Sequence, residues 1–234
     1  MSDPLAAVTA HLRAHFAALG MDSEPDVAGV TFLGVERIDV LRFGPDPRPG
    51  YENVFHHVSL GCSRYPMTDP AAAVADPLRG PRAEIVMSLR ASRPTTGLAR
   101  SLAVVAATPA VEGVVLAPDA LVDLSGPLWE ATPFTAVLLG VSDIGDCALD
   151  PPREPVQFLS ATPISQTEGA WVRLKGAEAM RQAWADDGVD VLDPLRPASS
   201  GGAGGADGAG LQSSQRWPPR GQDWLRPSRP ARAN

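Results

Sequence analysis

The chain has 234 residues, of which 44% are hydrophobic and 20% charged, a composition typical of a globular protein with one sizeable core. No apolar run reaches the roughly 18 residues that a membrane-spanning helix needs, so we expect no membrane segment. The net charge of −7 is uneven: residues 198–234 carry five arginines against two aspartates, a balance of +3 that leaves about −10 on residues 1–197 and argues against nucleic acid as a partner.

The first expected element is an amphipathic helix that ends near Gly20. Asp3 and Pro4 stand in the order of N-cap and then proline that favours a helix start, and apolar residues follow at helical spacing. This apolar face comprises Leu5, Val8, Leu12, Phe16 and Leu19.

Three segments in the first 90 residues have the composition of strands. Residues 30–43 are rich in β-forming side chains and lead into a proline-rich connection, GPDPRPG. Residues 54–60 alternate, with one face formed by Val54, His56, Val58 and Leu60 and the other by Phe55, His57 and Ser59. Residues 83–89 alternate again, with Ile85, Met87 and Leu89 expected inward and Glu84 and Ser88 on the opposite face.

The remaining elements are short strands and two helical segments. Residues 97–107 have helical spacing, and short apolar runs at 113–116, 120–124, 134–140 and 156–161 predict buried strands. Ser165 and Glu168 form a capping box for a helix that continues to Gly188, and Gly176 is expected to kink or split it. Its expected apolar stripe is Ala170, Leu174, Ala177, Met180 and Trp184. Without regular βαβ alternation, the pattern predicts an α+β fold with a mainly antiparallel or mixed sheet packed by helices.

The composition changes abruptly near residue 198. Residues 198–234 are first Gly-rich and then Pro- and Arg-rich, with too little apolar surface to offset the entropy of ordering them. We therefore expect a single domain over residues 1–197 and a disordered tail over 198–234. Trp217 and Trp224 in this tail are either small anchors for a partner or chance residues of a poorly constrained extension.

Several site classes are excluded or disfavoured. A Walker-type phosphate loop requires a lysine that is followed by Ser or Thr, whereas the only lysine, Lys175, is followed by Gly176. P-loop nucleotide chemistry is therefore excluded. Cys62 and Cys147 make neither a disulfide framework nor a zinc site. The start of the sequence has no basic region before an apolar stretch, so the expected compartment is the cytoplasm. We expect no cofactor and no metal.

The histidines are expected to be structural. Neighbours on a strand point to opposite faces, so His56 and His57 cannot hold one metal, and His56 is expected to be buried and bonded to the backbone or a carboxylate. His11 and His15 are four apart, but they lack the glutamate of an H-E-x-x-H motif and are expected to flank the apolar face of the first helix as ordinary structural residues.

Residues around Cys62 give the best enzymatic alternative. Cys62 could be an exposed thiol whose pKa is lowered by Arg64, with His57 as its base. No recognisable third group or oxyanion hole accompanies them, so we favour a non-enzymatic protein. Glu84 is expected to pair with Arg100 or Arg64. Arg64 and Tyr65 are interface candidates, because Tyr and Arg concentrate in protein-binding hot spots.

Four blocks of the sequence together resemble the suppressor of fused family. They are NVFHHVSLGCSRYPMT from Asn53, PRAEIVMSLR from Pro81, GLARSLAVVA from Gly97, and residues 158–171 with a Thr-Pro-Ile turn and a following Trp. The positions that match the family pattern are His56, Ser59, Gly61, Glu84, Gly97, Leu98 and Arg100. The resemblance covers roughly residues 3–197 and implies the same α+β class, with structural or interface roles for these positions.

The resemblance also implies a function. Members of the family are non-enzymatic binders, and the animal member clamps an extended peptide of a transcription factor between two domains. This chain resembles only the first of those domains, and stand-alone bacterial domains look like immunity proteins that neutralise toxins. We thus expect a cytoplasmic protein-binding module whose partner is a basic protein, either a toxin or a regulatory protein. The alternatives are a thiol-dependent enzyme using Cys62 and a housekeeping scaffold whose partner is encoded elsewhere.

Overall fold

The computed structural model describes residues 3–32, 34–68 and 76–199. The helices in this part are α1 (Pro4–Ala18), α2 (Leu98–Glu112), α3 (Gln166–Lys175) and α4 (Ala177–Asp186), with a short 3-10 helix, η1 (Cys62–Arg64). The strands are β1 (Asp26–Phe32), β2 (Val35–Phe43), β3 (Val54–Leu60), β4 (Arg82–Arg90), β5 (Leu121–Asp123), β6 (Phe134–Val141) and β7 (Val156–Ser165).

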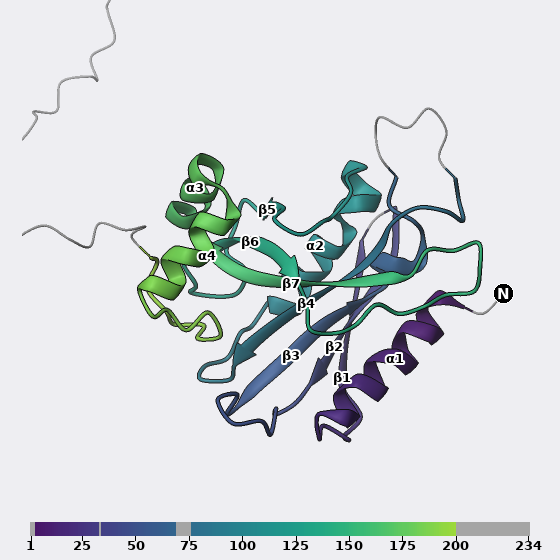
Figure 1. Cartoon of the computed structure of the whole chain (residues 1–234), viewed down its shortest axis with the longest axis horizontal. Coiled ribbons are helices and arrows are strands. Elements are labelled where there is room, and N and C mark those ends of the chain that lie inside the picture. Colours follow the sequence, from purple (N-terminus) through teal and green to yellow (C-terminus); the bar gives the residue numbers. More distant parts are fainter. Residues whose placement is uncertain (1–2, 33, 69–75, 200–234) are drawn as a thin grey trace, which may run out of the picture. The chain divides into compact units, whose positions relative to one another are not determined.

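The strands form one seven-stranded sheet in the order β1-β2-β3-β4-β7-β6-β5 (Figure 1). All neighbouring pairs are antiparallel except β4 and β7, which are parallel. The sheet is therefore mixed, and the predicted α+β class is confirmed.

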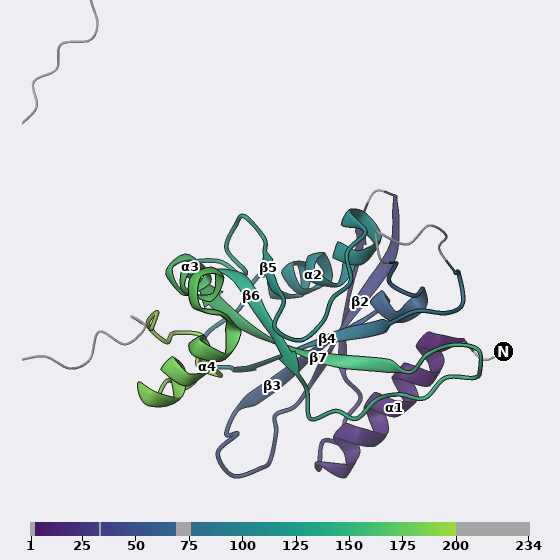
Figure 2. The same cartoon turned by 45° about the horizontal axis from the view of Figure 1, so that its top comes forward.

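Helices cover both faces of the sheet. α2 packs on one face over a core that includes Met87, Leu89 and Leu139. α1 packs on the other face near β2 and β3, and α3 and α4 pack near β6 and β7 (Figure 2). Because Phe158 and Ile164 of β7 are an even number of residues apart, the cores under α1 and under α3 and α4 lie on the same face of that strand.

The helix ends follow the local sequence signals. Asp3 Oδ1 accepts a hydrogen bond from the backbone N–H of Leu5 at 3.1 Å, and the predicted N-cap of α1 is confirmed. Ser165 and Glu168 form the predicted capping box of α3. Gly176, with φ of 90°, separates α3 from α4.

Three details of the sequence interpretation are wrong. Residues 30–43 are not one strand, because Gly34, with φ of 80°, lies between β1 and β2 and the chain folds back as a hairpin. Residues 113–116 form no strand, and the Leu116 N–H donates to Met67 Sδ at 3.3 Å. Ala170 and Leu174 are exposed, because the break at Gly176 changes the face that is buried.

None of the helices in the described ranges is long and apolar enough to cross a membrane. Ser199, at the start of the expected tail, is buried, and its N–H donates to Glu168 Oε1 at 3.3 Å. Residues 200–234, including Trp217 and Trp224, lie outside the described residues.

Candidate functional site

Ser59, Gly61 and Glu84 converge on one buried network. The Glu84 carboxylate is fully buried and accepts four hydrogen bonds. The Ser59 hydroxyl donates to Oε2, and the Gly61 N–H donates to Oε1 at 2.8 Å. Ser63 donates to Oε1 from its N–H at 3.0 Å and from its hydroxyl at 2.6 Å. The Glu84 carboxylate, on β4, is thus hydrogen-bonded both to Ser59 near the end of β3 and to Ser63 of η1.

Glu84 has no arginine partner among the described residues, so the expected ion pair with Arg100 or Arg64 is wrong. Arg64 pairs with Glu36 at 2.6 Å, and Arg100 is exposed on the first turn of α2. The serine hydroxyls and backbone N–H groups already occupy the acceptor sites of Glu84. Burial raises the pKa of Glu84, and the donors from Gly61, Ser59 and Ser63 oppose that rise.

His56 belongs to a second buried network. Its Nε2 lies 2.9 Å from Asp46 Oδ2 and its Nδ1 lies 2.7 Å from the Ser88 hydroxyl, so the prediction of a buried imidazole bonded to a carboxylate is confirmed. Asp46 also accepts two side-chain bonds from Arg48 Nε at 3.0 Å and one from Nη2 at 2.7 Å. Burial alone would raise the pKa of Asp46, but hydrogen bonds from Arg48 and His56 lower it to about 2.

The interface candidates Arg64 and Tyr65 lie together beside a cavity of about 450 Å³ between η1 and α2, here called the η1 cavity. Tyr65 is 59% exposed, and its hydroxyl donates to Glu36 Oε1 at 2.8 Å. Arg64 Nε lies 2.6 Å from Glu36 Oε2. Both candidates are therefore held by one carboxylate. The wall across the cavity includes Ala106, Ala107, Pro109 and Ala110 of α2.

Cys62 lines the η1 cavity but is not activated. Burial, together with the negative charge of Glu84, raises the pKa of the Cys62 thiol well above its usual value, so the expected lowering by Arg64 is wrong. The Arg64 guanidinium pairs with Glu36 instead. His57 lines a different cavity, beside α2's first turn, so thiol and imidazole are not assembled as nucleophile and base.

The family-pattern positions Gly97, Leu98 and Arg100 lie at the start of α2. Gly97 is the N-cap with φ of 98°, a left-handed conformation that favours glycine, and Leu98 is buried in the core against the sheet.

The histidines of α1, His11 and His15, make separate local contacts. His11 Nε2 lies 2.7 Å from the Gly145 carbonyl oxygen, and the His15 ring meets Phe16 edge-on at 5.1 Å. Both histidines are partly buried beside the apolar face of α1, as predicted.

Five partners of these side chains were not foreseen from the sequence: Glu36, Asp46, Arg48, Ser63 and Ser88. Asp46 lies in a proline-rich loop, and Ser63 stands two residues after Gly61, so neither belongs to an alternating pattern. The local composition therefore gave no signal for their contacts. Across residues 3–32, 34–68 and 76–199, no group of three or more His, Cys, Asp and Glu side chains could hold a metal ion.

Solved structures show which class of domain this fold defines. A suppressor of fused homolog from Neisseria gonorrhoeae matches with a TM-score of 0.58 and 19% identity over 84% of this chain and 97% of its own. A chain of the Sufu-Fu complex matches with a TM-score of 0.59 and 15% identity, over 83% of this chain and 91% of its own length. Drosophila Suppressor of Fused matches with a TM-score of 0.58 and 17% identity. The alignment covers 84% of this chain and 51% of the Drosophila chain. The fold is that of a suppressor of fused domain.

The sequence assigns the family. The family model described as suppressor of fused protein (SUFU) matches residues 34–197. The chain therefore belongs to the suppressor of fused family, as the sequence blocks predicted. No curated protein matches the chain.

Proposed function

We propose that this chain is a non-catalytic protein-binding module and that Glu36, Arg64 and Tyr65, with the η1 cavity, form its binding surface. The observation that carries the proposal is the exposed Tyr65 ring, whose hydroxyl is held by Glu36 at 2.8 Å. An aromatic side chain that is exposed and already restrained loses little entropy on binding. Tyr and Arg side chains of this kind are typical of interface hot spots.

The cavity gives this surface a place for a partner's side chain. Its volume of about 450 Å³ and its wall of small α2 residues fit an apolar group, while Arg64 and Tyr65 supply polar contacts next to it. The hydrogen bonds from the N–H groups of Gly61 and Ser63 to Glu84 stabilise η1, which lines this cavity. The surface is therefore preorganised before a partner arrives.

A related structure supports a protein as the partner. One of the similar chains, at 15% identity to this chain, comes from the Sufu-Fu complex. The thiol-enzyme alternative lacks support, because the pKa of Cys62 is raised and His57 lines another cavity. A protein-binding role requires neither group to react.

We further propose that the partner is a basic protein, with a toxin neutralised by this chain in the bacterial cytoplasm as the leading case. Residues 1–197 carry a net charge of about −10, which would speed association with a basic surface and favour it at low salt. A regulatory protein of similar charge is the runner-up within this class.

The test is affinity capture with the full chain in a lysate of its native cells, at about 50 mM and about 500 mM salt, because the higher concentration screens charge attraction. A stoichiometric basic protein that is released by salt would support the proposal, and growth arrest by that protein alone would identify a toxin. Capture of an acidic protein that resists salt would instead favour a scaffold.

A further inference from the structure

The segment that carries Tyr65 is attached to the start of β4 on both of its sides. Before Tyr65, the Ser63 N–H donates to the Glu84 carboxylate at 3.0 Å. After Tyr65, the Met67 N–H donates to the Pro81 carbonyl oxygen at 2.8 Å. The exposed Tyr65 therefore lies between two points of the chain that are fixed to the same strand end.

Arg82 makes a further attachment between these two segments. Its side chain is buried, and its Nη1 donates to the carbonyl oxygens of Ser63 at 2.8 Å and Arg64 at 2.9 Å. Its Nη2 donates to the Leu78 carbonyl oxygen at 3.3 Å. Carbonyl groups in the last turn of a helix have no N–H partner within that helix. Arg82 thus supplies the donors that the end of η1 lacks.

No carboxylate is paired with Arg82 in the described part of the chain, in contrast to Arg196, the other buried arginine there, which pairs with Glu168 at 2.6 Å. The Arg82 Nε has no hydrogen-bond partner among the described residues. A buried guanidinium without an acid is costly, so it persists only where hydrogen bonds stabilise its charge. Two of the three acceptors that stabilise Arg82 belong to η1.

Arg82 and Glu84 hold η1 at opposite ends. They are two residues apart on β4, so their side chains leave the strand on the same face. Glu84 accepts a hydrogen bond from the N–H of Gly61, the N-cap of η1, whereas Arg82 donates to the carbonyl oxygen of Arg64, its last residue. One face of one strand therefore fixes both the start and the end of η1.

We propose that Arg82 is a positioning residue of the binding surface, which with Glu84 fixes η1 so that Tyr65 meets Glu36 and presents its ring to a partner. Loss of Arg82 should loosen η1 before it affects the rest of the sheet, because two of its three hydrogen bonds end on η1. The benefit to a partner rests on the proposed function, whereas the effect on η1 and Tyr65 can be measured without one.

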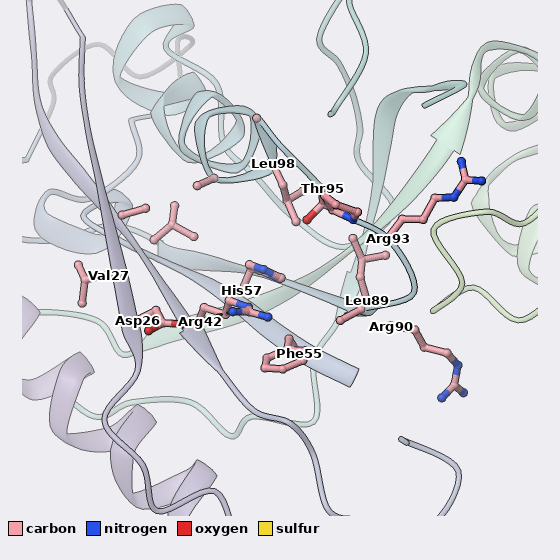
Figure 3. A pocket seen from close by; sticks show the side chains of 16 residues that line it. Asp26, Val27, Arg42, Phe55, His57, Leu89, Arg90, Arg93, Thr95 and Leu98 are labelled. Atoms are coloured by element: carbon pink, nitrogen blue, oxygen red, sulfur yellow. Dashed lines mark hydrogen bonds and ion pairs between the residues drawn. The ribbon is translucent and has the colours of Figure 1, made fainter. Parts of the chain in front are cut away.

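The test uses three variants of the full chain. Arg82→Met keeps most of the side-chain volume but removes the donors, and Arg82→Lys keeps the charge and some of the donors. The control is Arg93→Met, the same chemical change at an exposed arginine. Arg93 lines a separate cavity of about 400 Å³ beside the start of α2, which shares no lining residue with the η1 cavity (Figure 3).

The first measurement is amide hydrogen exchange by NMR. In Arg82→Met, the Ser63 and Met67 N–H groups should exchange at least about tenfold faster than in wild type, and in Arg82→Lys by a smaller factor. The Leu139 N–H, bonded to the Ala120 carbonyl oxygen at 2.8 Å far from η1, should change by less than about twofold. Equal acceleration of all three amides would show that Arg82 only supports the whole fold, and unchanged rates would show that it does not hold η1. Either result would overturn the proposal, and if Arg82→Met does not fold, Arg82→Lys decides between them.

The second measurement reports on Tyr65 itself. The hydrogen bond to Glu36 and the negative charge of that carboxylate raise the pKa of the Tyr65 phenol from its ordinary value of 10.0. The chain contains two tyrosines, so ¹³Cζ-labelled tyrosine gives one signal for Tyr65 and one for Tyr51. The Tyr65 pKa should fall towards 10.0 in Arg82→Met and stay raised in Arg93→Met. The same Tyr65 pKa in both variants would show that Arg82 does not position this side chain.

The link to binding is tested with the protein that wild type captures from its lysate and Tyr65→Ala loses. Arg82→Met should recover at least about fivefold less of it, and Arg93→Met should recover the wild-type amount. Full recovery by a folded Arg82→Met would overturn the positioning role. Absence of any partner with wild type would contradict the proposed function alone, because the exchange and titration experiments need no partner.

Discussion

Glu84 and Ser63 are joined by two hydrogen bonds to a single carboxylate oxygen, one from the Ser63 N–H at 3.0 Å and one from its hydroxyl at 2.6 Å. This contact joins the central strand β4 to η1, which precedes Tyr65 directly in the chain. The position of the proposed binding surface thus depends on an acid that is itself fully buried.

Removal of this acid should destabilise the domain. Glu84→Ala leaves the buried donors of Ser59, Gly61 and Ser63 without an acceptor, so we expect unfolding free energy to fall by about 3 kcal/mol. Urea denaturation measures this loss. The control is Glu178→Ala, whose side chain is 87% exposed and whose replacement should change stability by less than about 0.5 kcal/mol. Equal stability of the two variants would show that the network does not hold η1.

The Asp46 network predicts a pH dependence. The pKa of Asp46 is about 2 in the folded state and 3.8 without the surrounding structure, so its stabilising effect is present above pH 3.8 and is lost as the pH falls through about 2. Asp46→Asn should therefore destabilise the protein at neutral pH. The difference in unfolding free energy between wild type and variant should shrink as the pH approaches 2. A difference that stays constant from pH 7 to pH 2 would contradict the lowered pKa.

His57 predicts a second pH dependence at higher pH. Burial and the nearby Arg42 lower its pKa from 6.5 to about 4, so the folded state binds the proton more weakly than the unfolded state. Its contribution to stability is complete above pH 6.5 and is lost as the pH falls towards 4, by on the order of 3 kcal/mol. His57→Gln should remove this part of the slope in denaturation measured between pH 7 and pH 4. An unchanged slope would show that His57 titrates normally.

The last described segment should be essential for stability. Arg196 Nη1 lies 2.6 Å from Glu168 Oε1, with side-chain exposures of 3% and 0%, and Arg196→Ala leaves a buried carboxylate without its cation. We expect a loss of about 3–5 kcal/mol by thermal or urea denaturation. A chain that ends after Ser199 keeps this pair and should retain wild-type stability. If that truncation is as unstable as Arg196→Ala, the domain extends beyond the expected boundary.

The sequence predicted those parts of the fold that depend on short-range patterns. Asp3, the Ser165 and Glu168 capping box and the break at Gly176 all act within a few residues, and each is confirmed. The strand of residues 54–60 was likewise predicted from the alternation of side chains between its two faces. The hairpin of β1 and β2 was missed, because β-forming residues continue across the turn and obscure it.

The candidate site was less predictable, because its contacts join residues far apart in the sequence. His56 was expected to meet a carboxylate, but only the fold places Asp46 of the proline-rich loop beside it. Glu84 was assigned to an arginine because charge pairing is the usual solution for a buried acid. In the structure, Glu84 instead accepts hydrogen bonds from the hydroxyls of Ser59 and Ser63 and from backbone N–H groups. Such donors cannot be recognised from the residue composition of the sequence.

The most direct test of the protein-binding account compares capture by wild type, Tyr65→Ala and Leu174→Ala from the same lysate at low salt, with quantitative mass spectrometry. Leu174 is 74% exposed on α3 and serves as the matched control for loss of an exposed large side chain. The account predicts one stoichiometric partner that Leu174→Ala retains and that Tyr65→Ala loses by at least about tenfold, as expected for a hot-spot residue. Equal recovery with all three proteins would contradict a binding surface at Tyr65.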